Sequence, residues 1–425
     1  MGGICYMNNY IVGIDISSSK VCGVVGRLDQ ENKIQVMGIT TSDYEGVKDN
    51  VMLDEEDISY ILRNVVERLK EIVNSPLEEA YLSVPISLCE IVKTKGVLSF
   101  PETKEISKED ILNVGEVAKF CVGKEQEIVQ VDIEEYIVDS MKNITNPLGM
   151  KGKVLESEGN AFILSKKYVD GYKKCLKETG IEIKGWVVNA IGISKDIIED
   201  LELAKGVAII DIGSSNMEIT VFKNNRFLDY FSVPLGGNNI TNDISICLKL
   251  SLQDSERLKF KCNTLLKDNS TENHKIKINT SGNSIVEINY EMLVDIIGER
   301  VKELLEIINK RIEKEQLSDQ IGSFVIVGGG ISLFRDITTI ASEILGKPVR
   351  IGVPNYVGAA NPIYSTATGI IRDVLSKEEI FNKEKSSCES CNEKLSSSNN
   401  RSKENKFITR LKGILKSFSN EEVIK

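Results

Sequence analysis

Two distant segments of this chain carry a carboxylate and small polar residues in the same order. Small residues leave backbone N–H groups exposed in a turn, and serine hydroxyls add donors, so each segment predicts an anion-binding turn. A carboxylate beside a bound anion requires a cation, and Mg²⁺ held through its waters by both aspartates meets that requirement. The first segment contains Asp15, Ser17, Ser18, Ser19 and Lys20, and the second contains Asp211, Gly213, Ser214, Ser215 and Asn216.

Each turn lies between two apolar runs, in Ile11–Gly26 and again in Gly206–Lys223. Either copy alone would favour an ordinary β-hairpin that has a serine-rich turn. Two copies in the same order indicate an internal duplication, and a repeat of this kind constrains the whole fold. We therefore expect two similar halves that present their turns to one phosphate-bearing ligand between them.

Two glycine clusters could lie beside the same ligand. Gly236 and Gly237 precede a helical pattern, and Gly328-Gly329-Gly330 follows the apolar run Phe324–Val327. Glycine allows close approach of the backbone to a ligand, although a tight strand-to-helix turn has the same requirement. Glu256 and Lys259 are three residues apart in a helical pattern and share one face, either near the ligand or as a solvated pair.

Composition excludes several classes of protein. The 425 residues are 41% hydrophobic and 27% charged, with a net charge of -10, which is typical of a globular protein and argues against a general nucleic-acid binder. Nine scattered cysteines indicate a reducing cytoplasm, and a single histidine argues against Ser-His or Cys-His hydrolysis. No apolar run approaches the roughly 18 residues of a membrane span, and the first ten residues do not resemble a secretory signal.

Strand and helix patterns predict an α/β protein of mixed sheets with flanking helices. Strands are expected as three segments within Tyr10–Ile39 and at Ala80–Val84, Cys89–Lys93, Glu127–Val138, Ile181–Val188, Tyr230–Val233, Ser284–Ile288 and Phe324–Val327. Helices are expected at Asp54–Val73, Lys108–Phe120, Lys166–Glu178, Ala190–Leu201, Asp254–Lys261, Tyr290–Glu313 and Pro362–Leu375, and from Ile240 and Leu333 onward. Residues 85–162 interrupt the rhythm and predict a small inserted α+β domain.

The C-terminal segment predicts a flexible linker over residues 376–405 and an amphipathic helix over residues 406–420. Its basic, amphipathic character favours an anionic membrane surface over docking on the protein body or in a partner's groove. One face is apolar and the other basic: Phe407, Ile408, Leu411, Ile414, Leu415 and Phe418 against Lys406, Arg410, Lys412 and Lys416.

Two longer blocks resemble the FtsA family of bacterial cell-division proteins, within the actin/Hsp70/sugar-kinase superfamily. They are VPLGGNNITNDISICLKLSLQDSERLK (Val233–Lys259) and NPIYSTATGII (Asn361–Ile371). The resemblance implies an actin-like two-lobed ATPase fold with duplicated sheets. It assigns residues 8–84, 163–205 and 361–375 to the first lobe, 85–162 to the insert, 206–236 and 320–360 to the second lobe, and 237–319 to a subdomain of the second lobe.

The resemblance also implies ATP with Mg²⁺ as ligands. The two serine-rich turns would then hold the phosphates, Asp15 and Asp211 the metal, and the glycine clusters with Glu256 and Lys259 the adenosine side. Val187–Gly192 offers Asn189 only as a weak counterpart of the water-positioning Glu or Gln of strong ATPases. We therefore expect nucleotide binding with slow hydrolysis or none.

By the same resemblance, this protein would polymerise on the inner face of the cell membrane at the division site. It would tether the FtsZ ring there through the FtsZ C-terminal peptide and contact other division proteins. Basic residues of the long helix could meet that peptide, or could form a solvated face: Arg300, Lys302, Lys310 and Arg311. The alternatives are an actin-like adaptor of pilus or secretion assembly and a sugar or acid kinase of the same superfamily.

Overall fold

The computed structural model describes residues 10–382 of this chain, apart from positions 30, 32, 44–46, 49–50, 53–54, 121, 268–273 and 281–284. Most of the predicted linker and all of the amphipathic helix predicted over residues 406–420 lie outside the described residues. Within the described part, no helix is both long enough and apolar enough to cross a membrane.

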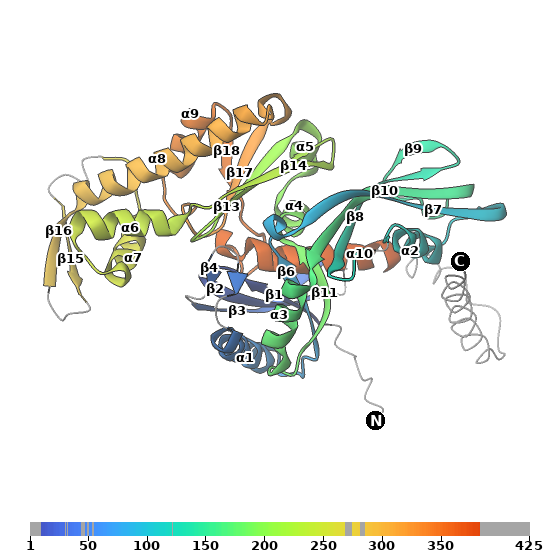
Figure 1. Cartoon of the computed structure of the whole chain (residues 1–425), viewed down its shortest axis with the longest axis horizontal. Coiled ribbons are helices and arrows are strands. Elements are labelled where there is room, and N and C mark those ends of the chain that lie inside the picture. The colour runs from blue at the N-terminus through green and yellow to red at the C-terminus, as the bar shows by residue number, and fades with distance from the viewer. Residues whose placement is uncertain are drawn as a thin grey trace, which may run out of the picture. The chain divides into compact units, whose positions relative to one another are not determined.

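The first half of the chain forms a five-stranded sheet in the order β11-β6-β1-β2-β3 (Figure 1). Its strands are β1 (Ile11–Ile16), β2 (Lys20–Leu28), β3 (Ile34–Asp43), β6 (Glu79–Val84) and β11 (Glu182–Val188). β1, β2 and β3 are antiparallel neighbours, whereas β6 and β11 continue the sheet in parallel on the other side of β1. The predicted three-stranded opening is therefore present.

Helices cover both faces of this sheet because successive side chains of each strand point to opposite faces. α1 (Glu55–Val73) and α3 (Lys166–Lys177) bury Leu62 and Tyr172 in the same core as Ile14. α10 (Ser365–Asn382) buries Ile370 with Val24 on the opposite face. A short hairpin, β4 (Val47–Lys48) with β5 (Val51–Met52), lies between β3 and α1 in the chain.

The second half repeats the same arrangement in the order β14-β13-β12-β17-β18. Its strands are β12 (Val207–Ile212), β13 (Met217–Lys223), β14 (Arg226–Val233), β17 (Ser323–Val327) and β18 (Val349–Ile351). The first three strands are again antiparallel and the last two again join in parallel beside the first. This shared topology confirms the duplication that the two turns predict.

Between β14 and β17 the described residues form α-helices and a hairpin, which extend from one side of the second sheet in Figure 1, followed by the short turn η2 (Ser318–Gln320). They are α6 (Gly237–Leu248), α7 (Leu252–Lys261), β15 (Lys275–Asn279), β16 (Ile285–Asn289) and α8 (Tyr290–Lys314). The long helix α8 buries Ile297 and Leu304 in one core with Ile210 and Ile219 of the sheet. α9 (Ile337–Leu345) joins this core between β17 and β18.

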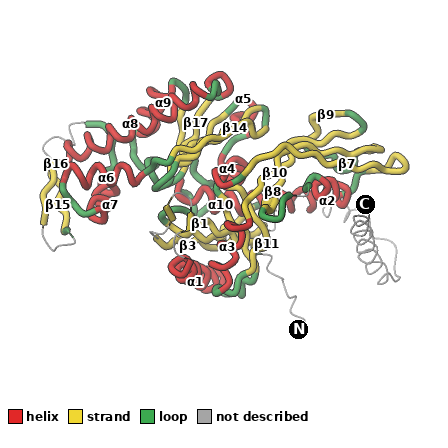
Figure 2. Tube along the Cα trace, in the orientation of Figure 1, coloured by secondary structure: helices red, strands yellow, loops and turns green. Residues whose placement is uncertain are grey.

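The inserted region, residues 86–165, is mostly strand with α2 on one face (Figure 2). It contains the short turn η1 (Ile86–Leu88), β7 (Glu90–Glu105), α2 (Lys108–Val117), β8 (Gln126–Val138), β9 (Met141–Ile144) and β10 (Lys151–Ser165). The sheet order is β7-β10-β8-β9, with all neighbours antiparallel. The first residue of β7 pairs with Ile163 near the end of β10, so the chain enters and leaves this region on adjacent strands.

Two helices between β11 and β12 in the chain differ from the sequence prediction. The sequence predicts one helix over Ala190–Leu201, but the structure has α4 (Asn189–Ile197) and α5 (Asp200–Lys205). The break falls at Ile198, whose backbone is extended, and a capping box between Glu199 and Glu202 starts the second helix.

Boundaries of other helices also shift. α6 begins at Gly237 rather than Ile240, and α9 begins at Ile337 rather than Leu333. A short turn η3 (Pro362–Tyr364) precedes α10, which continues past Leu375 to Asn382. The pair between Lys377 Nζ and Asp373 Oδ2, 2.5 Å apart and one helical turn from each other, supports this extension.

The main differences among strands lie in the inserted region. β7 has 16 residues where the sequence predicts only Cys89–Lys93, and the 15-residue β10 is not predicted at all. Lys151–Asn160 contains charged residues and two glycines, which disfavour a strand in isolation. β10 nevertheless lies between β7 and β8, so its backbone is paired on both sides.

Candidate functional site

The two predicted anion-binding turns meet in the structure. The turn between β1 and β2 closes with a hydrogen bond from Ser17 N to Lys20 O, and the turn between β12 and β13 closes identically from Gly213 N to Asn216 O, both 3.0 Å. The Ser18 and Ser214 hydroxyl oxygens are 2.6 Å apart, so one donates a hydrogen bond to the other. Equivalent turns of the two halves therefore share one site.

Both aspartates of the repeat lie at this site, Asp15 buried and Asp211 half-buried. Burial raises the pKa of Asp15, and a 2.5 Å hydrogen bond from Ser83 Oγ and the charge of Lys20 offset this only in part. Burial, followed by the negative charges of Glu218 and Asp15, raises the pKa of Asp211 to about 7. Two carboxylates, one buried and one half-buried, that repel each other provide an electrostatic preference for a cation.

This donor set fits a hydrated Mg²⁺ ion better than a directly coordinated metal. Among the residues that the structure describes, no group of three or more His, Cys, Asp or Glu side chains could hold a metal ion. Mg²⁺ commonly keeps several waters and is bound by one or two carboxylates together with phosphate oxygens. Asp15 and Asp211 would supply those carboxylates from the two halves.

Lys20 lies at the same site and contacts the segment before α10. Its Nζ donates a 2.7 Å hydrogen bond to the carbonyl of Ile363, in the turn that leads into α10. The first turn is thereby tied to the segment Asn361–Ile371, which the sequence singles out.

The segment Gly236–Asn238 packs against the second turn, Gly213–Asn216. Gly237 N and Asn238 N donate to the carbonyls of Gly213 and Ser214, at 3.0 and 2.7 Å. A Cβ atom at position 236 would lie 2.6 Å from the Gly213 oxygen, so only glycine fits without movement of the backbone. Glycine is therefore required at position 236 because two backbone segments pack too closely to leave room for a side chain.

The triple-glycine turn packs against the same segment. Gly330 N donates to the carbonyl of Ile212 (2.9 Å). Gly328 has φ +81°, and a Cβ atom there would lie 2.5 Å from Asp211 Oδ1. Both the left-handed backbone and the lack of space therefore require glycine at position 328.

Replacing Gly328 with alanine should weaken the nucleotide binding that the sequence predicts about tenfold, or roughly 1.4 kcal/mol, because the new methyl group displaces the Asp211 carboxylate. Gly346→Ala is the matched control, since Gly346 has φ +68° but a Cβ atom there would meet no other atom within 4 Å. Titration of each variant with a fluorescent ATP analogue measures the effect. Equal affinities for the two variants would contradict this role of Gly328.

Lys259 of α7 is buried, and with the partly exposed Glu256 it forms a polar cluster with α6. Lys259 Nζ donates to Glu256 Oε2 (2.7 Å), Thr241 Oγ1 (3.0 Å) and the carbonyl of Gly237 (3.2 Å). Burial lowers the pKa of Lys259, although the charge of Glu256 opposes this shift. Lys259 is therefore not a solvated lysine, and the pair contacts the first turn of α6 beside the turn Gly213–Asn216.

Glu218, a buried carboxylate on β13, belongs to the site although the sequence does not predict it. It lies directly opposite Asp211 across the β12–β13 ladder. It accepts hydrogen bonds from Ser87 Oγ, from Ser87 N (3.3 Å) and from Asn189 Nδ2 (2.6 Å). A single acidic residue within the apolar run Met217–Phe222 is the available signal for this position.

The four basic residues proposed for partner binding lie on α8, and each contacts a carboxylate. Arg300 pairs with Asp243 and Glu303, and the remaining pairs are Lys302–Glu299 (2.7 Å), Lys310–Glu306 (3.5 Å) and Arg311–Glu315 (2.9 Å). A pocket of about 440 Å³ between α6 and α8 is lined by Arg300 and Lys302 and by four carboxylates. Its charge is mixed rather than basic.

Family models match two parts of this chain. The model described as "Cell division protein FtsA" matches residues 208–369, and the model described as "SHS2 domain inserted in FTSA" matches residues 87–162. The second match falls on the inserted region of the fold.

Curated relatives match most of the chain. Cell division protein FtsA of Bacillus subtilis is 31% identical, over 86% of this chain and 83% of the relative. Its counterpart in Borreliella burgdorferi is 28% identical, over 95% of this chain and 98% of the relative.

Two solved structures share the fold at low identity. The PilM-PilN type IV pilus biogenesis complex matches with a TM-score of 0.57 and 13% identity, over 86% of this chain and 98% of the matched chain. MreB5 of Spiroplasma citri bound to ADP matches with a TM-score of 0.51 and 14% identity, over 88% and 99%.

Proposed function

This chain belongs to the FtsA family of cell-division proteins, and we propose that it binds Mg·ATP between its two phosphate turns and links the division machinery to the membrane. The observation that carries the nucleotide proposal is the meeting of two equivalent turns, with Ser18 and Ser214 in hydrogen-bond contact, each turn following an aspartate whose pKa is raised. MreB5 of Spiroplasma citri, which shares the fold, was solved bound to ADP, and this supports a nucleotide as the ligand.

Each part of the site has a separate task in this proposal. The turns Ser17–Lys20 and Gly213–Asn216 would donate backbone N–H groups and hydroxyls to phosphate oxygens. Asp15 and Asp211 would hold Mg²⁺ through its waters, and the bound ion would neutralise phosphate charge. Gly236, Gly237, the Glu256–Lys259 pair and Gly328–Gly330 would form the adenosine side.

We expect hydrolysis to be weak or absent because Asn189 is held by structural contacts. Its Oδ1 accepts from Ile86 N (3.0 Å) and Ala190 N (2.8 Å), and its Nδ2 donates to Glu218 (2.6 Å). An amide engaged at both ends is poorly placed to orient an attacking water, and a group that orients the nucleophile is part of phosphoryl transfer.

Membrane attachment would come from the segment Phe407–Phe418. Six apolar side chains at up to ~2 kcal/mol each give a ceiling of ~12 kcal/mol, and ordering about a dozen residues costs ~1 kcal/mol or more each. One tail should therefore bind marginally, whereas several tails on a polymer would bind firmly through effective concentration. The proposal thus couples self-assembly to residence on the membrane.

Deleting residues 406–425 should reduce co-sedimentation with anionic liposomes at least tenfold and leave ATP binding unchanged. A sharper pair of variants adds the same charge to opposite faces of the predicted helix. Leu411→Glu on the apolar face should abolish pelleting, and Thr409→Glu on the polar face should largely preserve it. Equal pelleting of the full-length and truncated proteins, measured with and without Mg·ATP, would overturn the membrane proposal.

We place the FtsZ C-terminal peptide at the pocket between α6 and α8. Because Arg300 and Lys302 already contact carboxylates, an acidic segment would have to replace those partners. A peptide that carries both signs of charge around an apolar anchor suits this lining better. A pull-down with the FtsZ tail peptide also separates this function from the pilus adaptor, whose support is a likeness of fold at 13% identity.

A further inference from the structure

Glu218 is a buried carboxylate that the nucleotide proposal does not use. It belongs to β13 of the second sheet, is 7% exposed and lies opposite Asp211 in the ladder. A buried charge persists only where hydrogen bonds or ion pairs satisfy it. The hydrogen-bond partners of Glu218 therefore show which elements its carboxylate joins to β13.

Those partners belong to the inserted region and to α4. One carboxylate oxygen accepts from Ser87 N (3.3 Å) and Ser87 Oγ, within the turn that leads into β7. The other oxygen accepts from Asn189 Nδ2 (2.6 Å), at the first residue of α4. Asn189 Oδ1 in turn accepts from Ile86 N (3.0 Å), which closes a ring of hydrogen bonds. One side chain of the second sheet thus fixes both elements.

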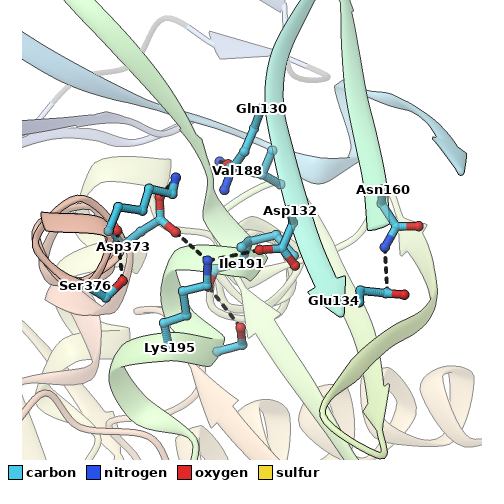
Figure 3. A network of polar contacts seen from close by, with 11 residues as sticks. Gln130, Asp132, Glu134, Asn160, Val188, Ile191, Lys195, Asp373 and Ser376 are labelled. Carbon is cyan, nitrogen blue, oxygen red and sulfur yellow. Dashed lines mark hydrogen bonds and ion pairs between the residues drawn. The ribbon is translucent and has the colours of Figure 1, made fainter. Parts of the chain in front are cut away.

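The far end of α4 carries a second polar anchor (Figure 3). Lys195 Nζ lies 2.9 Å from Asp132 Oδ1 on β8 and 2.7 Å from Asp373 Oδ1 on α10. Gln130 of β8 also accepts a hydrogen bond from Val188 N (2.6 Å), just before α4. The nine-residue helix α4 therefore contacts the hairpin of Glu218 and the inserted region at its N-terminal end, and the inserted region and α10 near its C-terminal end.

The docking of β8 on this helix leaves one polar atom unsatisfied. Gln130 Nε2 is buried and has no hydrogen-bond partner among the described residues. Such groups are rare in folded proteins, and each one opposes the arrangement that buries it. Hydrogen bonds and an ion pair thus hold the inserted region against α4. The unsatisfied Gln130 Nε2 raises the free energy of this arrangement, which favours an inserted region that can move relative to α4.

We propose that Glu218, acting through α4, couples occupancy of the second phosphate turn to the docking of the inserted region. This inference rests on the proposed binding of Mg·ATP. Without a cation, Asp211 and Glu218 repel each other across the ladder, and Glu218 is driven toward Ser87 and Asn189. A cation held by Asp211 attracts Glu218 in the opposite direction and competes with those two partners. Nucleotide binding therefore weakens the bonds of Glu218 in the ring at the base of the inserted region, while Asn189 Oδ1 keeps its contacts with Ile86 N and Ala190 N.

Hydrogen exchange of the full-length protein, with and without saturating Mg·ATP, tests this coupling. In the wild type, nucleotide should protect the two phosphate turns and make residues 85–92 and 187–192 exchange about tenfold faster. Glu218→Gln should lose the faster exchange, because its neutral amide has no charge for the cation to attract. Glu202→Gln is the matched control, since Glu202 also joins two elements through Arg350 (2.6 Å) and lies outside the ring. It should respond like the wild type.

A double variant separates charge from hydrogen bonding. In Glu218→Gln with Asn189→Asp, the amide and carboxylate exchange places, so the bond between the two positions is kept while the charge moves away from Asp211. Exchange without nucleotide should return to the wild-type rate, and the response to nucleotide should stay absent. A response in Glu218→Gln equal to that of the wild type would overturn the inference, as would a wild type that binds a fluorescent ATP analogue without any change in these segments. A wild type that binds no nucleotide would overturn both proposals.

Discussion

Replacing Lys195 with methionine should lower the free energy of unfolding by about 3 kcal/mol, the lower end of the range for breaking a buried ion pair. The Asp373 carboxylate is fully buried and would keep only Lys377 as its cationic partner. Asp132 would lose its contact with α4 in the same step. Urea denaturation followed by circular dichroism measures the change.

Lys119→Met provides the control for the loss of a lysine. Lys119 forms an exposed pair with Glu116 (2.6 Å), and pairs of that kind contribute about 0–1 kcal/mol. A loss of stability in Lys195→Met no larger than in Lys119→Met would show that the Lys195 network is not a stabilising one.

The same network fixes the sign of a pH effect. Burial opposes ionisation of Asp373, but the charges of Lys195 and Lys377 hold its pKa below the usual 3.8. A carboxylate with a lowered pKa stabilises the folded state above about pH 4, and that contribution disappears as the pH falls through its folded-state pKa. The stability gap between the wild type and Lys195→Met should therefore narrow below about pH 4.

Replacing Asp211 with asparagine should weaken the binding of Mg·ATP by about 10- to 100-fold, the usual effect of removing a group that holds a metal through its outer shell. The substitution keeps the shape of the side chain and removes its charge. Titration with a fluorescent ATP analogue in the presence of Mg²⁺ measures the loss.

The sign of the effect should reverse when Mg²⁺ is removed. In excess EDTA, Asp211→Asn should bind free ATP at least as well as the wild type, because one negative charge near the phosphates is gone. Asp229→Asn, at an exposed position on β14, controls for the change in net charge and should leave both titrations unchanged. Equal weakening of binding with and without Mg²⁺ would argue for a general disruption of the site instead.

Much of the architecture could be predicted because its signals are local. The repeated order of carboxylate, turn and apolar run predicts the duplicated hairpins, and the structure contains both. Apolar periodicity predicts α8 within one residue at its C-terminal end. The Glu256–Lys259 spacing predicts a shared helical face, which the 2.7 Å contact between them reproduces.

Contacts between distant parts of the chain could not be predicted in the same way. Lys195 meets Asp132 and Asp373 only because β8 and α10 both pack against α4, and no local pattern encodes that meeting. The partners of Glu218 could not be predicted either, since Ser87 and Asn189 come from other elements. The sequence does not predict β10, because its residues have a weak local preference for a strand and pairing with two neighbouring strands outweighs that preference.

The pairing of Glu90 with Ile163 means that residues 86–165 are joined to the rest of the chain at two neighbouring points. Segments whose ends lie close together can be gained or exchanged during evolution without disturbing the host fold. The parallel pairing of β6 with β11 is intact on either side of this junction. The ancestral two-sheet scaffold could thus have acquired a whole module by grafting at a single site, and a transplant from a relative into the same junction is a practical route to chimeric proteins.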